Sequence, residues 1–351
     1  MFFLIWIKNN NTLVPVFKKI MKGYKKIILF FLLGGGLISF IPPEKVLWKI
    51  FQKGNSDLPD NGIISIGIDS LNNKWVGTDG KGLGRFDGTS WKVFTAGNSG
   101  LSNNSIYAIC MDKNIKWFGT HGGGLVSLEG DDNWEVYNME NSDLPHDWIN
   151  TIAVDAKGDK WIGAGDSGVV RFDNQKWTSF NEKNSGLPNN IVYAIAIDDK
   201  NGIYWFGTES GGLARYDGTN WKVFQTSNSG LPNDWVAELA FEDSILWIGT
   251  VGGGLTKMTG ETFVTYNIGN SGLPNNSVYA ISVDEKKFKW IGTGGGGLVK
   301  FDGDSSWVVF DKSNSEIPKD FVLTVSIDSK NTKSIGTWKG GLALYNENGI
   351  E

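Results

Sequence analysis

Apolar and polar residues alternate at a period of two in many short stretches of this chain. The stretch IISIGID, residues 63–69, is the first clear example, and KWVGT, GLGRFDG and WKVFTA follow it at residues 74–78, 82–88 and 91–96. Turns rich in Asn, Asp and Gly separate these stretches, and Asp-Gly pairs favour tight hairpins because their central residues accept positive φ. The pattern predicts a unit of four short antiparallel β strands.

This unit is repeated along the chain. Each copy opens with an Asn-Ser pair, continues with Leu-Pro or a close variant, and then carries Trp-x-Gly-Thr, Gly-Gly-Leu and Trp-x-Val-Phe motifs. The copies start near residues 55, 98, 141, 184, 228, 270 and 314, in steps of 42 to 44 residues. Four-stranded units at this period are typical of β-propellers, which usually have four to eight blades.

The last copy ends at residue 351 without its fourth strand. The missing strand is found at the other end of the repeat region, where Trp48 and Phe51 match Trp91 and Phe94. We therefore expect the N-terminal strand to complete the last blade and remove two open sheet edges. The predicted fold is an all-β, seven-bladed β-propeller over residues 44–351, with four-stranded blades.

Residues 1–43 have a different composition. They contain six Lys and no acidic residue, with an apolar run at residues 27–41. A basic region followed by a short apolar core is typical of a signal peptide, although an uncleaved membrane anchor is the alternative. We expect export to the periplasm or the cell surface, with membrane contact only through this segment if it is not cleaved.

Charge and cysteine content exclude several functions. Residues 44–351 have 27 basic and 38 acidic side chains, a net charge of −11, which argues against nucleic acid as a partner. Cys110 is alone, so neither a disulfide within the chain nor a cysteine-based zinc site is possible. The two histidines, His121 and His146, lie in different loops without metal-ligand spacing. We expect no cofactor, no metal and no catalytic site.

One face of the predicted ring offers a candidate binding site. The loops between second and third strands, which hold the Gly-Gly pairs, are expected to share a face with the Asn-Ser connections between blades. Loops are where repeat scaffolds vary. Twelve tryptophans fit predicted packing positions between blades, but Trp148, Trp235 and Trp338 on this face do not.

These three tryptophans have two interpretations. They could form an aromatic platform for sugar rings or another flat ligand, with Phe321 at the position equivalent to Trp148. Polar neighbours that could orient a ligand are His146, Asp147, Asn233 and Asp234. Alternatively, the tryptophans cap loops or pack on the neighbouring blade.

The inner strands contain one unusual charge. Most of their positions near the predicted axis carry Gly, Ala, Ser or Thr, whereas Glu238 is acidic. We expect Glu238 to face a solvated central channel or to bind a ligand or cation there. The glycines at 294–297 suggest a phosphate loop at first sight, but they join two strands rather than a strand and a helix, so we interpret them as structural.

The repeat resembles that of the two-component regulator propeller family, which reads LPNNxVxAIxxDxxxxxWIGTxGGGLxRFDG. The resemblance covers about residues 44–351. It implies a seven-bladed propeller like those in the periplasmic sensing parts of hybrid histidine-kinase sensors, several of which respond to oligosaccharides. This sequence shows one ring and no kinase or receiver domain, so signalling would need a separate kinase partner.

We therefore expect an exported, non-catalytic propeller that binds an oligosaccharide through the loop face. Two alternatives stay open. One is a scaffold for a protein partner, and the other is a propeller enzyme, such as a polysaccharide lyase or hydrolase, that uses Glu238 or Glu209.

Overall fold

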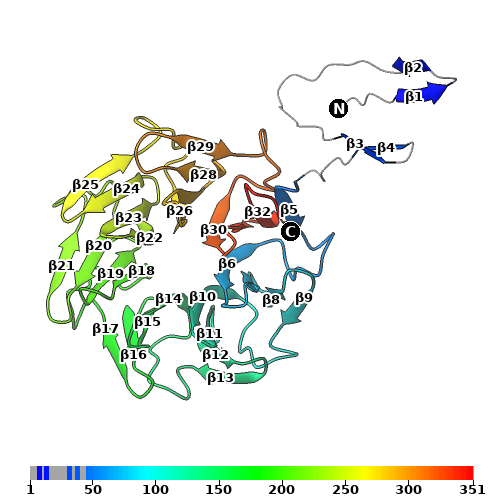
Figure 1. Ribbon diagram of the computed structural model, residues 1–351. Helices are drawn as coiled ribbons and strands as arrows, with labels where there is room; N and C mark the ends of the chain where they lie inside the picture. The colour runs from blue at the N-terminus through cyan, green and yellow to red at the C-terminus, as the bar shows by residue number, and fades with distance from the viewer. Residues whose placement is uncertain (1–5, 10–11, 16–29, 34–35, 40–44, 351) are drawn as a thin grey trace. The chain divides into compact units, whose positions relative to one another are not determined.

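The structure is a computed structural model that describes residues 6–9, 12–15, 30–33, 36–39 and 45–350. It divides into two compact units, residues 1–45 and 46–351. Every regular element in the described ranges is a β strand. The second unit is a closed ring of seven four-stranded sheets, which confirms the predicted seven-bladed propeller (Figure 1).

The first unit contains two small hairpins. Strand β1 (Trp6–Asn9) pairs with β2 (Thr12–Pro15), and β3 (Phe30–Leu33) pairs with β4 (Gly36–Ser39). Within the described residues, no helix is long and apolar enough to cross a membrane. Most of the expected signal peptide or anchor, residues 1–43, lies outside the described residues, so that prediction stays a prediction.

The strands of the first four blades are consecutive in sequence. Blade 1 contains β6 (Ile63–Ile68), β7 (Lys74–Thr78), β8 (Leu83–Phe86) and β9 (Trp91–Phe94). Blade 2 contains β10 (Ile106–Asp112), β11 (Ile115–Thr120), β12 (Leu125–Glu129) and β13 (Asn133–Tyr137). Blade 3 contains β14 (Ile149–Val154), β15 (Lys160–Ala164), β16 (Val169–Phe172) and β17 (Trp177–Phe180). Blade 4 contains β18 (Val192–Asp198), β19 (Ile203–Thr208), β20 (Leu213–Tyr216) and β21 (Trp221–Phe224).

The remaining blades include the closing one. Blade 5 contains β22 (Val236–Glu242), β23 (Ile245–Thr250), β24 (Gly254–Thr259) and β25 (Thr262–Tyr266). Blade 6 contains β26 (Val278–Val283), β27 (Lys289–Thr293), β28 (Leu298–Phe301) and β29 (Trp307–Phe310). Blade 7 contains β30 (Val322–Ile327), β31 (Lys333–Thr337), β32 (Gly341–Tyr345) and, from the start of the propeller, β5 (Trp48–Phe51).

The closing pair forms as the sequence predicts. Strand β5 pairs antiparallel with β32, with Trp48 opposite Tyr345 and Phe51 opposite Leu342 (Figure 1). Beyond the strands, the N–H of Ile350 donates to the carbonyl of Val46 at 2.7 Å. The ring is therefore closed by hydrogen bonds between segments about 300 residues apart in sequence.

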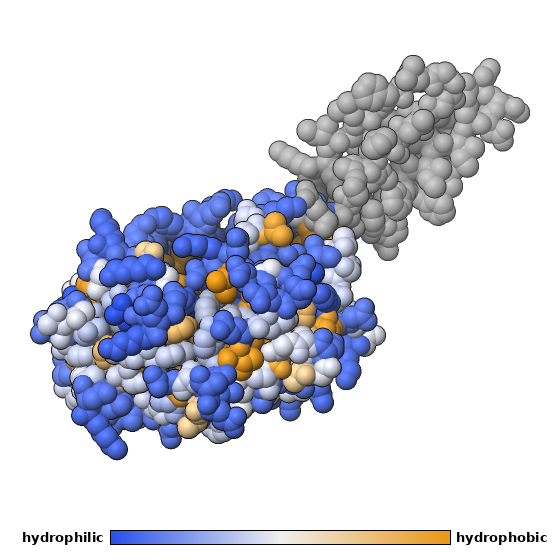
Figure 2. All heavy atoms as spheres, turned by 90° about the horizontal axis from the view of Figure 1, so that it is seen from below, coloured by the Kyte–Doolittle hydropathy of each residue, from blue (hydrophilic) through white to orange (hydrophobic). Residues whose placement is uncertain are grey.

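The core consists of apolar layers between neighbouring blades. Five of the second-strand tryptophans are at most 3% exposed, namely Trp75, Trp117, Trp161, Trp247 and Trp290. Such a ring packs with aromatic residues of two neighbouring blades. Trp75, for example, lies 5.6 Å from Phe94 of its own blade and 5.7 Å from Phe118 of the next. The outer surface is mostly hydrophilic, with scattered apolar residues, where Figure 2 views the ring edge-on.

The Gly-Gly loops need glycine for a steric reason. Gly297 has φ of +85°, and a Cβ there would lie 2.2 Å from the carbonyl oxygen of Phe310. The equivalent Gly82 has φ of +94° and the same conflict with Phe94. Only glycine tolerates both the conformation and the close approach. The interpretation of residues 294–297 as a structural loop is thus supported.

Candidate functional site

The Gly-Gly loops and the Asn-Ser connections share one face of the ring. In every blade the last glycine of the loop donates its N–H to a carbonyl in the connection to the next blade, at 2.8 to 3.0 Å. The seven pairs are Gly82–Asn104, Gly124–Asp147, Gly168–Asn190, Gly212–Asp234, Gly254–Asn276, Gly297–Asp320 and Gly341–Asn61. The predicted assignment of these loops to one face is confirmed, and we call it the loop face.

A β bulge at the start of each inner strand shapes the centre of this face. In β18, for example, the register shifts between Val192 and Ala194, which leaves Tyr193 without a ladder partner. Residues left unpaired by a bulge are re-aimed relative to the strand. The bulged residues are Ile64, Tyr107, Asn150, Tyr193, Ala237, Tyr279 and Leu323.

Each tyrosine in this set is linked, directly or through one further ring, to an aromatic residue of the following blade. The ring of Tyr193 stacks on Trp235, with centroids 6.3 Å apart, and Tyr279 stacks on Phe321 at 5.4 Å. The third tyrosine, Tyr107, reaches the next blade through the ring of His121. Thus an aromatic residue after the Leu-Pro motif is accompanied, in all three cases, by a tyrosine in the preceding blade.

Trp148 is the centre of the largest of these clusters. Its ring stacks on His121 with centroids 4.1 Å apart, and His121 stacks on Tyr107 at 4.7 Å. His146 contacts the same tryptophan edge-on at 5.5 Å, and its Nδ1 accepts the N–H of Trp148 at 2.9 Å. The two histidines, distant in sequence, therefore meet at one indole ring.

The three candidate tryptophans are far more exposed than the packing tryptophans. Trp148 is 47% exposed, and Trp235 and Trp338 are each 37% exposed. Trp338 lies beside Phe321, because its N–H donates to the Phe321 carbonyl at 3.0 Å. We define the aromatic rim as Tyr107, His121, Trp148, Tyr193, Trp235, Tyr279, Phe321 and Trp338.

The polar neighbours predicted from the sequence have structural partners. The carboxylate of Asp147 accepts the N–H of Met139, and that of Asp234 accepts the N–H of Thr226. Asn233 caps the turn before Trp235 by accepting its N–H at 2.8 Å. These side chains fix the connections and thereby the position of the tryptophans. Their contact with a ligand stays a prediction.

The inner strands enclose a central cavity of about 260 Å³. Tyr107 and Tyr193 line it as well as belonging to the aromatic rim, so the rim borders the cavity at these two tyrosines. Glu238 is the one acidic residue among the described residues that line it. Burial raises the pKa of Glu238 to about 8, because removal from water disfavours the charged form.

Two serine hydroxyl groups of the cavity wall form hydrogen bonds between neighbouring blades. Ser282 donates to the carbonyl of Val325 at 2.6 Å, and Ser326 donates to that of Ile66 at 2.9 Å. Both bonds join neighbouring blades. The cavity wall carries one carboxyl group among its described residues, that of Glu238, beside the phenol groups of Tyr107 and Tyr193.

The described residues contain no group of three or more His, Cys, Asp or Glu side chains placed to hold a metal ion. Burial also raises the pKa of the Cys110 thiol to about 11, which disfavours the nucleophilic thiolate. Cys110 packs among apolar residues of the layer around Trp117 and Ile149.

Sequence reasoning missed half of the aromatic rim. It identified Trp148, Trp235, Trp338 and Phe321, but not Tyr107, Tyr193, Tyr279 or His121. The signal that could have identified the tyrosines is their nearly constant spacing from the aromatic residues of the next blade. The tyrosines precede the aromatic residues of the next blade by 41 or 42 residues, about one blade. Sheet pairing alone does not indicate that these positions touch.

The fold and the rim define a seven-bladed propeller with an aromatic opening on its loop face. Residues 186–210 match the family model described as two component regulator propeller. This stretch contains the Leu187-Pro188-Asn189 and Trp205-Phe206-Gly207-Thr208 motifs. The chain thus carries a repeat of that family, as the sequence resemblance indicated. No curated protein matches the chain in sequence.

Solved structures share the fold. The extracellular domain of BT3049 from B. thetaiotaomicron, assigned as a hybrid two component system, aligns with TM-score 0.72 and 21% identity. The alignment covers 86% of this chain but 42% of that one. PorZ of the type-IX secretion system of Porphyromonas gingivalis aligns with TM-score 0.66, 18% identity and coverage of 90% and 49%.

A virginiamycin B lyase from Staphylococcus aureus also aligns, with TM-score 0.66, 14% identity and coverage of 85% and 98%. At these identities the comparisons establish the propeller fold. This chain spans about two fifths of the length of the first sensor domain.

Proposed function

We propose that the protein is an exported, ligand-binding propeller that recognises an oligosaccharide on the aromatic rim. The observation that carries the proposal is the set of exposed tryptophans, Trp148, Trp235 and Trp338, gathered on the loop face with stacked tyrosines, two of which line the central cavity. Flat aromatic faces bind the apolar faces of sugar rings, while polar groups nearby fix their orientation.

Packing alone does not account for these rings. The second-strand tryptophans complete the inter-blade layers and are almost fully buried. Trp148 instead leaves 47% of its surface exposed, although it is held by two histidines and a backbone hydrogen bond. A large apolar ring that is rigidly held and still exposed is typical of a binding surface.

The rim suits an extended ligand. Its aromatic residues belong to blades 2 through 7, so they are distributed around the ring. A chain of sugar units would contact several clusters at once. The partial resemblance to extracellular sensor domains supports an exported location.

The test is a binding screen of the full chain against plant, algal and host-type oligosaccharides by thermal shift and calorimetry. Ligand at a hundred times its dissociation constant stabilises the folded state by about 2.7 kcal/mol, which is readily measured. Trp148→Ala and Trp235→Ala should abolish the shift without unfolding the protein.

Leu71→Ala is the matched control, because Leu71 is 80% exposed in a turn between first and second strands, on the face opposite the rim. A sugar that binds both tryptophan variants as it binds the native chain would contradict the proposal. Silence across the panel, together with specific capture of a protein from the periplasm, would favour the scaffold alternative.

One observation favours an enzyme as the second candidate. Groups able to transfer protons lie on the loop face and in the cavity, because His121 and His146 contact Trp148 and Glu238 lines the cavity. Glu209 is close to the rim as well, because its carboxylate adds to the effect of burial in raising the pKa of Tyr193. A lyase would release unsaturated sugars with ultraviolet absorbance, and Glu238→Gln or Glu209→Gln should stop their release.

A further inference from the structure

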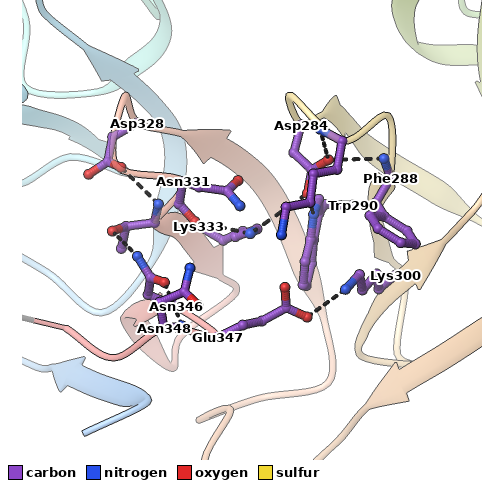
Figure 3. A network of polar contacts seen from close by, with 12 residues as sticks. Asp284, Phe288, Trp290, Lys300, Asp328, Asn331, Lys333, Asn346, Glu347 and Asn348 are labelled. Atoms are coloured by element: carbon purple, nitrogen blue, oxygen red, sulfur yellow. Dashed lines mark hydrogen bonds and ion pairs between the residues drawn. The ribbon is translucent and has the colours of Figure 1, made fainter. Parts of the chain in front are cut away.

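The face opposite the aromatic rim carries a repeated polar contact at the seams between blades. Figure 3 shows it at the seam between blades 6 and 7, where Lys333 extends toward the end of the inner strand of blade 6. Its Nζ lies 3.8 Å from the carboxylate of Asp284 and 4.4 Å from the ring centre of Trp290. The ammonium thus occupies a niche made by a carboxylate and an indole face.

The same niche is filled at other seams. Lys160 lies 3.7 Å from Asp112 and 4.8 Å from the ring centre of Trp117. Lys289 lies 2.9 Å from Glu242 and 4.9 Å from the ring centre of Trp247.

Two further seams fill the niche in related ways. Lys74 pairs with Asp328 at 2.8 Å, in the seam where Ser334 replaces the tryptophan. At the seam between blades 3 and 4 the residue is Tyr204, whose hydroxyl donates to Asp155 at 3.2 Å. The tyrosine ring covers Trp161 at 4.1 Å. A side chain from the second strand of the next blade therefore fills the niche in each case.

At the seam between blades 1 and 2, Lys116 lies 6.0 Å from the ring centre of Trp75 and forms no ion pair with Asp69 in the described residues.

The seam between blades 4 and 5 lacks the lysine altogether. The position equivalent to Lys289 is Leu246, which has no polar group to offer Asp198. In the described part of the chain, Asp198 forms no ion pair, and its carboxylate accepts bonds from Asn201. Trp205 is 8% exposed, against at most 3% for the other five second-strand tryptophans. The carboxylate of Asp198 and the indole of Trp205 are therefore present at this seam, but the position that supplies the ammonium elsewhere holds Leu246.

A pocket of about 810 Å³ opens at this seam. Trp205, Leu246, Phe241 and Met258 form its apolar part, and Asp198 lies among its polar lining residues. The turns that border it join first to second and third to fourth strands, so it lies on the face opposite the rim.

Among the other charged residues that line the pocket, Asp243, Glu261 and Arg215 have ion-pair partners, whereas Lys200 forms no ion pair in the described residues. Asp243 pairs with Lys287, and Glu261 pairs with Lys222. Arg215 is directed to Asp217 at 3.8 Å and forms no ion pair with Asp198 in the described residues. Asp198 is therefore the carboxylate that a cation entering the pocket would meet.

We propose that this seam pocket binds an alkylammonium group, as found on a small primary amine or a lysine side chain. The ammonium takes the place of the absent lysine between Asp198 and the face of Trp205, and the alkyl chain lies on Leu246 and Met258. A cation over an indole ring and beside a carboxylate is favourable when partly removed from water. The site is separate from the aromatic rim, so it does not depend on the proposed function.

The experiment uses the full chain and n-butylammonium, with 1-butanol as the uncharged probe of similar shape. Ligand-observed NMR and thermal shift should detect the amine and not the alcohol. Asp198→Asn should weaken amine binding by about tenfold or more, the loss expected for a charge-assisted bond. Asp243→Asn is the control variant, because Asp243 already pairs with Lys287.

Leu246→Lys provides an independent arm, because it should supply the missing ammonium from within the chain. That variant should melt higher than the native protein and lose the response to the amine. N-acetyl-lysine methylamide, compared with n-butylammonium, distinguishes a lysine side chain from a free amine as the preferred source. Equal binding of amine and alcohol, or unchanged amine binding in Asp198→Asn, would overturn the proposal.

Discussion

The ring of Trp48, at the start of the propeller, lies 4.4 Å from the ring of Tyr345 at its end. These two residues also face each other across the last rung of the closing strand pair. Trp48 further contacts Phe310 of blade 6, at 6.0 Å. A single side chain near the N-terminal end of the ring therefore joins the last blade to its neighbour.

Removing this strand should open the ring. Deleting residues 44–53 should lower the melting temperature strongly or cause aggregation, because β32 would expose an unpaired edge. The milder change Trp48→Ala should cost about 3 kcal/mol of unfolding free energy, the usual loss for a large aromatic residue in a packed layer. Denaturant unfolding of both variants, with Leu71→Ala as the exposed control, checks this. An unchanged melting temperature after the deletion would refute closure by β5.

Glu238 should make stability depend on pH. Its pKa is about 8 in the folded chain, against 4.5 for an ordinary glutamate. Below pH 4.5 both states are protonated. Between these values the unfolded chain loses the proton while the folded chain keeps it, so the unfolding free energy falls as pH rises. Above pH 8 the loss is complete and constant.

Glu238→Gln should abolish this fall. One pKa unit corresponds to about 1.4 kcal/mol, and contact with water in the cavity reduces the effect, so we expect a gain of about 2 kcal/mol at pH 8. Urea unfolding at pH 5 and pH 8 measures it, with Glu209→Gln as the control. Parallel pH profiles for Glu238→Gln and the native chain would show that Glu238 titrates normally.

The glycine loops should tolerate no side chain. Gly297→Ala should cost about 3 kcal/mol, because it combines positive φ with a Cβ 2.2 Å from the Phe310 oxygen. Gly88 is a matched control, since it also has positive φ but no atom lies within 4 Å of its Cβ position. Gly88→Ala should cost about 1 kcal/mol from backbone strain alone. Equal losses in thermal unfolding would show that the close approach is unimportant.

The buried ion pairs at the seams should matter more than the exposed ones. The side chains of Lys333 and Asp284 are almost fully buried, so Lys333→Met leaves an unpaired carboxylate in the interior. We expect a loss of about 3 kcal/mol. Lys222→Met breaks an exposed pair with Glu261 and should change stability by less than about 1 kcal/mol. Comparable losses in the two variants would contradict this view of the seams.

Much of the fold could be predicted because it depends on local patterns. The alternation of apolar and polar residues predicts the strands, and the regular spacing of the Asn-Ser pairs predicts the blades. The match of Trp48 to Trp91 gives the closure. The loop face also follows, because turns of an antiparallel meander alternate between faces.

The detail of the sites could not be predicted in the same way. The contacts of Tyr193 with Trp235, and of His121 with Trp148, cross a seam between blades. Position within the repeat does not say which residues of two blades touch there. The pocket at Leu246 is a further example. Most equivalent positions carry lysine, but the sequence alone does not show that Leu246 lies beside Asp198 and Trp205.

The bond from Gly341 to Asn61 repeats, across the closing seam, the bond that Gly82 makes to Asn104. The array of blades consequently has no terminal member. A linear array of repeats can fray from its ends, one unit after another. In this ring a blade is released only after two seams have separated, so partial unfolding is suppressed and the seven blades should melt as one cooperative unit.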